Sequence, residues 1–494
     1  MLKAFFHDGA VYGLVRVVTS SVYLLLVPLY TRSLSTADYG VVDFLMIFSN
    51  LIYLVVTFEI AQGFARYFAE SKSAEEKISY ASSTLWFTIV AYTLFTISAL
   101  FFSQILSNVL LDSSEYKDIV KVAALAMWGH GLFYLVQNQL RYELKAGKYA
   151  IASLAFGLVS VVMTIVLLLV FELGVMGVFL AQLSANLAGA VVGLYFARHS
   201  YRWVFDWGKC QEMMRFSIPL CFSSLGVFAA LYMDRIAIRY LMSIDDLGIY
   251  AVGYRIASVT LLAMAGFQMA LTPLIYQHYR KEETPQEIER IFRWFLSLVF
   301  PLVLLVGMFS VEVISIFGTE QYTQAHRVVF VLAMAFLFSN MYMFGPGLWI
   351  AKKTRVIAAI NLVAAGLNLL LNFAFIPYLG ILGAALATCV SALVALVGYI
   401  VLGQNLYRIP YQWGRIGPSL IIMIALAAPS MQTNNIWSAA SGLWGLLFKG
   451  LVLIATSVVL TIFLVGLKEV TASVEFLRNR LKTFIPVLVA KTPS

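Results

Sequence analysis

Charged residues are scarce in this sequence. Asp, Glu, Lys and Arg make up 12% of the 494 residues, whereas hydrophobic residues make up 61%. A soluble domain usually has about 25% charged residues, so the composition excludes an ordinary soluble protein. Apolar runs of about 20 residues, the length of a membrane-spanning helix, recur along the whole chain. The strict alternation of a membrane β-strand, over about 10 residues, does not occur. We therefore expect an all-α integral membrane protein.

Motifs for metal, nucleotide or catalytic chemistry are also missing. The three cysteines, Cys210, Cys221 and Cys389, have neither metal-ligand spacing nor the pattern of a disulfide framework. The sequence contains no P-loop and no HExxH motif. We expect a protein that is not an enzyme, with no catalytic residue, metal or cofactor. Because basic residues of short loops set membrane topology, the net charge of +9 does not indicate a nucleic-acid partner.

Fourteen apolar segments predict fourteen membrane spans. The first is too long for a cleavable signal peptide and is expected to be retained. Basic residues such as Arg66, Lys145 and Arg280 gather in the loops after even-numbered spans. The positive-inside rule therefore places both termini in the cytoplasm. The expected spans are 10–31, 41–64, 81–105, 118–139, 149–171, 175–197, 214–237, 247–275, 292–316, 325–349, 355–377, 380–403, 417–434 and 441–466.

The chain repeats itself after about two hundred residues, and such repetition indicates a duplicated architecture. Shifted by 208 positions, Ser35, Asp38 and Gly40 fall on Ser243, Asp246 and Gly248. LGVMGVFLA at 173–181 returns as LGILGAALA at 379–387, a shift of 206. The expected organisation is an N-terminal six-helix lobe (1–197), a cytoplasmic loop (198–213), a C-terminal six-helix lobe (214–403), two additional helices (404–467) and a cytoplasmic tail (468–494).

Six spans per repeat give two halves with the same orientation in the membrane. Parallel repeats of this kind recur in transporters, where the substrate site lies between the halves and alternating access exposes it to either side. Ionisable residues within spans are costly and usually face a cavity. Arg255 lies eight residues into its span, about 12 Å deep, which favours an anion-binding cavity residue over a buried structural pair. Arg16 is a second candidate, with snorkelling to the headgroups as the alternative.

Other polar residues within spans leave two interpretations open. His130 is either packed between helices or part of a proton relay, and Glu59, near the inner end of the second span, is the other candidate for ion coupling. Asn361, Asn368 and Asn372 share one helix face, which is either an interhelical contact or a cavity wall. Asp234 and Arg235 are adjacent, so they point about 100° apart and cannot share one partner. A structural role at the outer rim is expected for this pair.

The chain resembles a known family. The residues that carry the resemblance are Pro28-Leu29-Tyr30-Thr31-Arg32, Ala37-Asp38-Tyr39-Gly40, Leu140-Arg141-Tyr142, Asp234-Arg235, Asp246-Leu247-Gly248-Ile249-Tyr250 and Tyr254-Arg255. Their order and spacing, with the six-plus-six-plus-two plan, are similar to the bacterial polysaccharide transporter family. This family of O-antigen and exopolysaccharide flippases belongs to the multidrug/oligosaccharidyl-lipid/polysaccharide (MOP) superfamily. The resemblance covers nearly the whole chain.

The resemblance implies a flippase of the bacterial inner membrane. Its substrate would be an undecaprenyl-diphosphate-linked oligosaccharide, moved from the cytoplasmic to the periplasmic leaflet, with Arg255 and Arg16 binding the diphosphate. Partners would be the bilayer and, in the same pathway, a polysaccharide polymerase and chain-length proteins. The main alternative is a cation-coupled multidrug exporter of the same fold. Such exporters commonly carry a membrane-embedded acid in the N-terminal half. Here Asp43 is expected at the outer edge of its span, and Glu59, the remaining candidate, lies near the inner end. A membrane polymerase or ligase is disfavoured because no large periplasmic loop is present.

Overall fold

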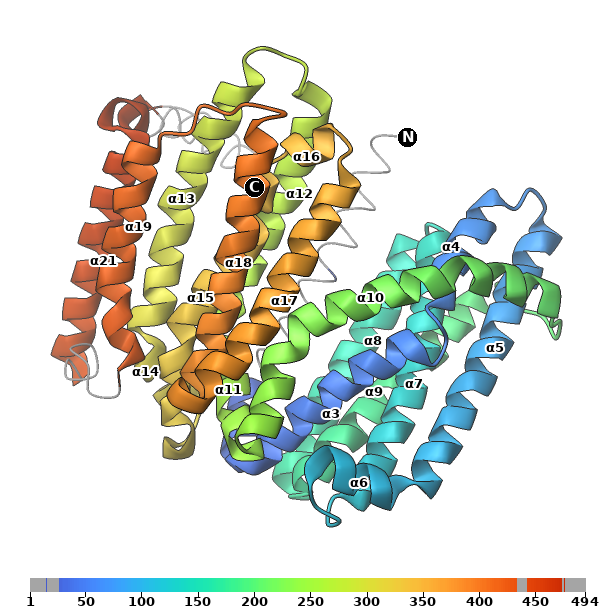
Figure 1. The fold of residues 1–494 in the computed structure, drawn as a ribbon. Helices are drawn as coiled ribbons and strands as arrows, with labels where there is room; N and C mark the ends of the chain where they lie inside the picture. The colour runs from blue at the N-terminus through green and yellow to red at the C-terminus, as the bar shows by residue number, and fades with distance from the viewer. Residues whose placement is uncertain (1–14, 16–25, 433–441, 473–474, 476–494) are drawn as a thin grey trace, which may run out of the picture. The chain divides into compact units, whose positions relative to one another are not determined.

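The computed structural model describes residues 15, 26–432, 442–472 and 475 of the chain, and these residues form helices without any strand (Figure 1). From Val27 to Leu241 the helices are α2 (Val27–Ser33), α3 (Thr36–Val55), α4 (Ile60–Glu70), α5 (Ala74–Phe101), α6 (Ser103–Leu111), α7 (Lys117–Tyr142), α8 (Ala146–Ile165) with the π-helix η1 (Val166–Val170), α9 (Gly174–Ala197), the 3-10 helix η2 (Arg198–Ser200) and α10 (Trp207–Leu241).

The second half of the chain is also mainly helical. From Ile244 on, the helices are α11 (Ile244–Ala257), α12 (Val259–His278), α13 (Thr284–Met308), α14 (Ser310–Phe317), η3 (Glu320–Ala325), α15 (His326–Asn340), η4 (Met341–Phe344), α16 (Gly347–Ile350), α17 (Thr354–Leu379), α18 (Ile381–Gln404), α19 (Trp413–Ala427), η5 (Ala428–Met431) and α21 (Gly442–Val465).

Within the described residues, 13 helical segments are long and apolar enough to cross a membrane. They correspond one to one with the second to fourteenth predicted spans. Most of the first predicted span, 10–31, lies outside the described residues. The chain is therefore a multi-pass helical membrane protein, as the sequence predicted.

The chain divides into two compact units. The first comprises the described residues of Met1–Arg255, Ser315–Thr323 and Asn368–Ala384. In this unit, glycines of α9 let the side chains of α7 approach closely. A Cβ at Gly189 would lie 2.6 Å from the Phe133 ring, and one at Gly193 would lie 2.7 Å from a Val136 methyl group. Small residues at helix contacts commonly let membrane helices approach each other closely, and these glycines do so here.

The second unit comprises the described residues of Ile256–Ile314, Gln324–Leu367 and Ala385–Ser494. Two buried cations pair with acids inside it. Arg293 bonds Glu289 at 2.8 Å and also donates to the carbonyl oxygens of Leu464 and Val465, at the end of α21. Lys449, with no exposed surface, forms an ion pair with Glu312. Both cations thus have the partners that burial demands.

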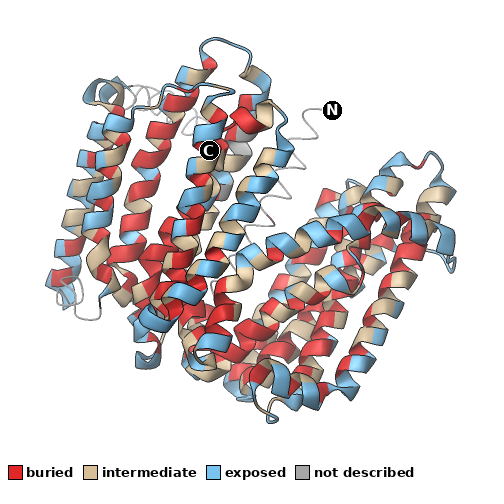
Figure 2. Cartoon of the chain, viewed as in Figure 1, coloured by how far each residue is buried: buried red, intermediate tan, exposed pale blue. Residues whose placement is uncertain are grey.

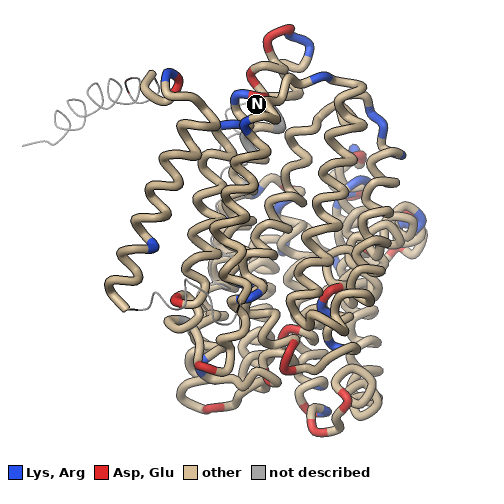
Figure 3. The backbone as a smooth tube through the Cα atoms, turned by 60° about the vertical axis from the view of Figure 1, so that its left-hand side comes forward, with Lys and Arg blue, Asp and Glu red and all other residues tan. Residues whose placement is uncertain are grey.

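The surface of the long helices is apolar where a bilayer would touch it. Exposed residues run along the outer faces of α5 and α21 (Figure 2), and they include Leu94 and Leu451, each more than 60% exposed. Charged residues gather mainly at helix ends and in the connecting segments (Figure 3). Such apolar bands with polar ends suit helices surrounded by lipid.

The second predicted span requires a correction. The hydropathy pattern predicts one continuous helix over 41–64, but α3 ends at Val55 and α4 begins at Ile60. Between them, Phe58 and Glu59 have φ values of 49° and 51°. The left-handed conformation is unfavourable for residues with a Cβ and concentrates at functional sites. The break therefore places Glu59 at a bend and not within a regular helix.

Candidate substrate-binding site

The repeated sequence motif forms two helix N-termini in the first unit. The Ser35 hydroxyl caps α3 by accepting from the Asp38 backbone N–H, and the Asp38 carboxylate accepts from the Ser35 N–H in return. At α11, the Ser243 hydroxyl likewise accepts from the Asp246 N–H and donates to the Asp246 carboxylate. The first is a capping box, and the second shares its N-cap hydroxyl bond. Such caps are signals that start a helix. The Thr36 hydroxyl also donates to Asp245, at 2.6 Å, and joins the two N-termini.

A cluster of four charged residues, three of them buried, is formed by α3, α10 and α11. Arg235 contacts the Asp43 carboxylate at 3.3 Å, and Arg255 approaches the other oxygen of Asp43 at 3.8 Å. Asp234 accepts from the Tyr250 hydroxyl at 2.5 Å and from the Arg235 backbone N–H at 2.8 Å. The adjacent Asp234 and Arg235 thus have different partners, as the helix geometry predicted. With two acids and two bases, the cluster has no net charge.

Arg255 differs from the rest of this cluster in exposure. Its side chain is 29% exposed, whereas those of Arg235 and Asp43 are 6% and 2% exposed. The Arg235 guanidinium lies 3.7 Å from the centre of the Tyr254 ring, which covers it. Arg255 is therefore the charged group of the cluster that a ligand can reach. Arg16, the other arginine expected to bind a diphosphate, lies outside the described residues.

The position of Asp43 was predicted wrongly. The hydropathy pattern predicts Asp43 at the outer edge of a span, but α3 begins at Thr36, so Asp43 lies two turns inside the helix and is 2% exposed. The capping box at Ser35 and Asp38 was the signal that could have set this earlier start. Asp43 is thus a buried acid of α3, with Arg235 and Arg255 as its partners.

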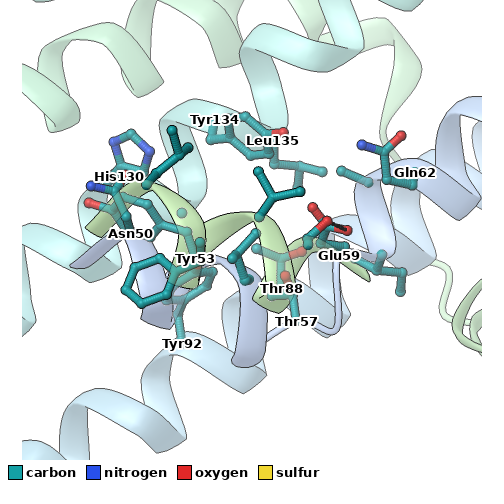
Figure 4. Close-up of a pocket in the computed structure, with 18 of the residues that line it drawn as sticks. Asn50, Tyr53, Thr57, Glu59, Gln62, Thr88, Tyr92, His130, Tyr134 and Leu135 are labelled. Carbon is teal, nitrogen blue, oxygen red and sulfur yellow. Dashed lines mark hydrogen bonds between the residues drawn. The ribbon is translucent and has the colours of Figure 1, made fainter. Parts of the chain in front are cut away.

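A separate cavity of about 520 Å³ opens in the same unit (Figure 4). It brings together the two predicted coupling residues, since Glu59 and His130 both line it. Glu59 accepts a hydrogen bond from the Ser224 hydroxyl at 2.8 Å, and His130 stacks on Tyr53 with ring centres 3.9 Å apart. The cavity volume falls in the range of about 300–1,000 Å³ that is typical of small-molecule sites.

The three predicted asparagines of α17 lie outside this cavity. Asn368 and Asn372 are buried, and the Asn372 amide donates to the Asn368 carbonyl and side-chain oxygens at 2.9 and 3.0 Å. Asn361 is exposed and accepts from the Tyr399 hydroxyl at 2.6 Å. Their bonds connect neighbouring residues of α17 or link it to α18. Among the residues that the structure describes, no group of acids, histidines and cysteines is arranged to hold a metal.

Comparison with known proteins identifies the family. A family model described as "Polysaccharide biosynthesis protein" matches residues 29–327, which is more than half of the chain. The chain belongs to this family. Among curated relatives, the Lsg locus putative protein 1 of Haemophilus influenzae is 24% identical over 395 residues, 76% of this chain and 94% of that protein. The probable low-salt glycan biosynthesis flippase Agl15 of Haloferax volcanii is 25% identical over 224 residues, 44% of this chain and 47% of that protein.

Solved structures show the fold of this polysaccharide biosynthesis protein. The lipid II flippase MurJ, in an inward closed conformation, matches with a TM-score of 0.71 and 14% identity, over 91% of this chain and 97% of MurJ. An inward-facing multidrug resistance MATE transporter matches with a TM-score of 0.63 and 13% identity, over 80% of this chain and 97% of that one. The fold is that of the MOP superfamily, which the sequence resemblance predicted. The names of these proteins, flippases and transporters, agree with the expectation that the chain is not an enzyme.

Proposed function

We propose that this protein is a flippase for lipid-linked oligosaccharides in surface polysaccharide biosynthesis. Its substrate is an undecaprenyl-diphosphate-linked unit of O-antigen, capsule or exopolysaccharide, which it moves from the cytoplasmic to the periplasmic leaflet of the bacterial inner membrane. Membership of the polysaccharide biosynthesis family and the MOP fold support this proposal. Cytoplasmic termini follow from the Lys/Arg bias of the loops.

The observation that carries the proposal is the exposed edge of Arg255. A diphosphate needs a cation within the membrane, and a guanidinium binds phosphate oxygens through paired hydrogen bonds. Arg255 is the accessible member of the cluster, with a side chain that is 29% exposed. A diphosphate would bind at this exposed part of the guanidinium. Arg16 remains the second proposed diphosphate ligand.

Alternating access of two six-helix lobes, 1–197 and 214–403, is the proposed mechanism, as in other transporters with repeats. Glu59 and His130 are the proposed coupling residues, because both are titratable and line one cavity. If a proton drives transport, Glu59→Gln should remove the dependence of flipping on a pH gradient. Interaction with a polysaccharide polymerase and chain-length proteins stays a prediction.

Flipping in proteoliposomes tests the proposal. Wild type, Arg255→Ala and Arg255→Lys are reconstituted with an undecaprenyl-diphosphate-linked oligosaccharide, and Arg66→Ala is the control because Arg66 forms an exposed pair with Glu70. We expect wild type and Arg66→Ala to flip the lipid and Arg255→Ala to lose at least about tenfold in rate, the loss of one charge-assisted contact. Full activity of Arg255→Ala would remove Arg255 from the mechanism.

Multidrug export is the second candidate function. The observation in its favour is the carboxylate of Glu59 in a cavity with aromatic walls, a setting that also attracts cations. The same proteoliposomes distinguish the two functions. Extrusion of a cationic dye without flipping of the lipid-linked oligosaccharide would replace the flippase proposal by the exporter.

A further inference from the structure

The lining of the 520 Å³ cavity is aromatic and polar but contains little charge. Rings line it from several helices, namely those of Tyr53, Tyr92, His130, Tyr134, Phe228 and Tyr232. Among the described lining residues, Glu59 is the one carboxylate and none is a lysine or arginine. A diphosphate would meet a like charge there and no cation. The cavity therefore suits a different portion of the substrate.

We propose that this cavity binds the saccharide portion of the substrate while the diphosphate lies at Arg255, an inference that rests on the proposed function. A pyranose ring has two apolar C–H faces and a rim of hydroxyls that donate and accept hydrogen bonds. Aromatic rings pack against such faces. Hydroxyl and amide side chains such as Asn50, Thr57 and Gln62, which also line the cavity, bind the rim.

The aromatic wall is held in place by its own packing. The His130 ring is nearly parallel to two tyrosine rings, with its centre 3.9 Å from that of Tyr53 and 6.2 Å from that of Tyr134. Gly131 makes room for a further ring, because a Cβ at this position would lie 2.4 Å from the ring of Tyr92. Rings fixed before binding lose little entropy when a ligand stacks on them.

Thr88 adds an unsatisfied polar group to the wall. It is 3% exposed, and its hydroxyl has no hydrogen-bond partner within the described part of the chain. A buried hydroxyl without a partner is costly, and such groups in native structures call for an explanation. A sugar hydroxyl in the cavity would supply the partner.

Glu59 determines which class of saccharide fits. Its carboxylate accepts hydrogen bonds from hydroxyl, amide or ammonium groups and repels another carboxylate. The left-handed break at Phe58 and Glu59 places it in the lining. We therefore expect neutral, amino or acetamido sugars in the cavity, and exclusion of uronic and other acidic sugars.

Helix α3 connects the two parts of the proposed site. Asp43, Met46, Asn50 and Tyr53 follow one another at spacings of three, four and three residues, so they share one helix face. The Arg255 guanidinium lies 3.7 Å from the Met46 sulfur, and Asn50, one turn further on, lines the cavity. The rise from Asp43 to Asn50 is about 10 Å. A saccharide joined to a diphosphate at Arg255 would therefore have to reach about 10 Å along α3 to enter the cavity.

Comparison of two substrates tests this site. Undecaprenyl diphosphate carrying a neutral oligosaccharide and the same lipid with no sugar are offered to wild type, Tyr92→Ala and Thr88→Val in proteoliposomes. We expect the variants to lose at least about tenfold in flipping of the glycosylated lipid and to keep wild-type flipping of the bare lipid. Tyr378→Ala, at an 88% exposed tyrosine outside the cavity, should leave both unchanged. An equal loss for both lipids, or no loss, overturns the saccharide site.

A binding measurement covers the case in which a variant folds poorly. Asn50 is exposed and lines the cavity, so the thiol of Asn50→Cys should react with a maleimide. The glycosylated lipid should slow this reaction and the bare lipid should not, and a glycan that contains uronic acid should protect less. Equal protection by both lipids, or protection by a cationic dye alone, overturns the proposal. If wild type flips neither lipid, the proposed function itself fails, whereas loss of the substrate difference alone concerns only the cavity.

Discussion

Gly40 of α3 and Gly248 of α11 each lie against the first residue of the other helix. A Cβ at Gly40 would lie 1.9 Å from the Ile244 carbonyl oxygen, and a Cβ at Gly248 would lie 1.9 Å from that of Thr36. The two glycines are 208 positions apart and occupy equivalent places in the repeat. The duplicated motif thus forms a nearly symmetric crossing in which the backbones touch, a contact that only glycine permits.

This crossing predicts a strong effect of small substitutions. Gly40→Ala and Gly248→Ala should each force the two backbones apart, because the group in the way is a carbonyl that cannot turn aside. We expect a loss of about 1–3 kcal/mol or more in stability, measured by thermal unfolding in detergent, and loss of transport. Gly366→Ala is the matched control, since nothing lies within 4 Å of its added Cβ. Wild-type stability of both variants would mean that the helices do not touch.

Two arginines near the crossing occupy equivalent positions in the two repeats, and each donates to a backbone carbonyl of the other repeat. Arg32 donates to the Ile316 carbonyl at 2.8 Å, and Arg239 donates to the Leu110 carbonyl at 3.2 Å. The arginines are 207 positions apart and the carbonyls 206 apart. Since each bond connects the first repeat to the second, the two repeats are joined here twice in equivalent ways.

If transport requires this junction to open, a covalent bridge across it should stop transport. Thr36 and Asp245 are 2.6 Å apart between their side-chain oxygens. We expect Thr36→Cys/Asp245→Cys, joined by a short reducible bis-thiol reagent, to flip no substrate until the bridge is reduced. Each single cysteine variant treated with the same reagent is the control. Flipping at the wild-type rate by the bridged protein would show that the junction stays closed throughout the cycle.

The Asp43 and Arg235 pair predicts a non-additive mutant cycle. Asp43→Asn leaves the buried Arg235 without its carboxylate, and loss of one partner of a buried ion pair costs about 3–5 kcal/mol. Arg235→Gln leaves Asp43 with the more distant Arg255. We expect the double variant to be less destabilised than the sum of the two single variants, with unfolding in detergent as the measurement. Additive effects would contradict a direct interaction.

Stability should fall in acid through Glu143, which lies between α7 and α8. Burial raises the pKa of Glu143, but its ion pair with Lys145 and its hydrogen bonds with Ser200 and Gln139 outweigh burial and lower the pKa below its ordinary value. A lowered pKa in the folded state stabilises at neutral pH. The contribution is complete above about pH 4.3, the ordinary glutamate value, and disappears as the pH falls through the folded-state pKa.

The measurement for Glu143 is a comparison with Glu143→Gln. The variant should be less stable than wild type by about 1.5–3 kcal/mol at pH 7, and the difference should shrink as the pH falls below about 4.3. Glu172→Gln is the control, because it removes a carboxylate at a different place in the chain. A difference that stays constant down to acid pH would show that the charge of Glu143 does not contribute.

The sequence alone determined the fold class, thirteen of the spans and the family. A membrane-spanning helix must be long enough to cross the bilayer, whose thickness does not depend on how the protein folds. Apolar runs of that length therefore predict the spans. The repeated Ser–x–x–Asp–x–Gly motif also predicted where two helices begin, because helix capping depends on residues that are close in sequence. The contact between Gly40 and Gly248 could not be predicted from the sequence, because sequence spacing does not show which distant backbone segments touch.

Only the tertiary structure decided which polar groups meet. Asp43 was placed at a helix edge by the hydropathy pattern, yet it became the partner of Arg235 and Arg255 because three helices bring these residues together. The break before α4 and the joint lining by Glu59, His130 and four tyrosines likewise depend on packing. Charge pairing and cavity formation arise between residues that are distant in sequence. A span pattern specifies how deep a residue lies in the bilayer, whereas its partner is specified by the packing of the helices around it.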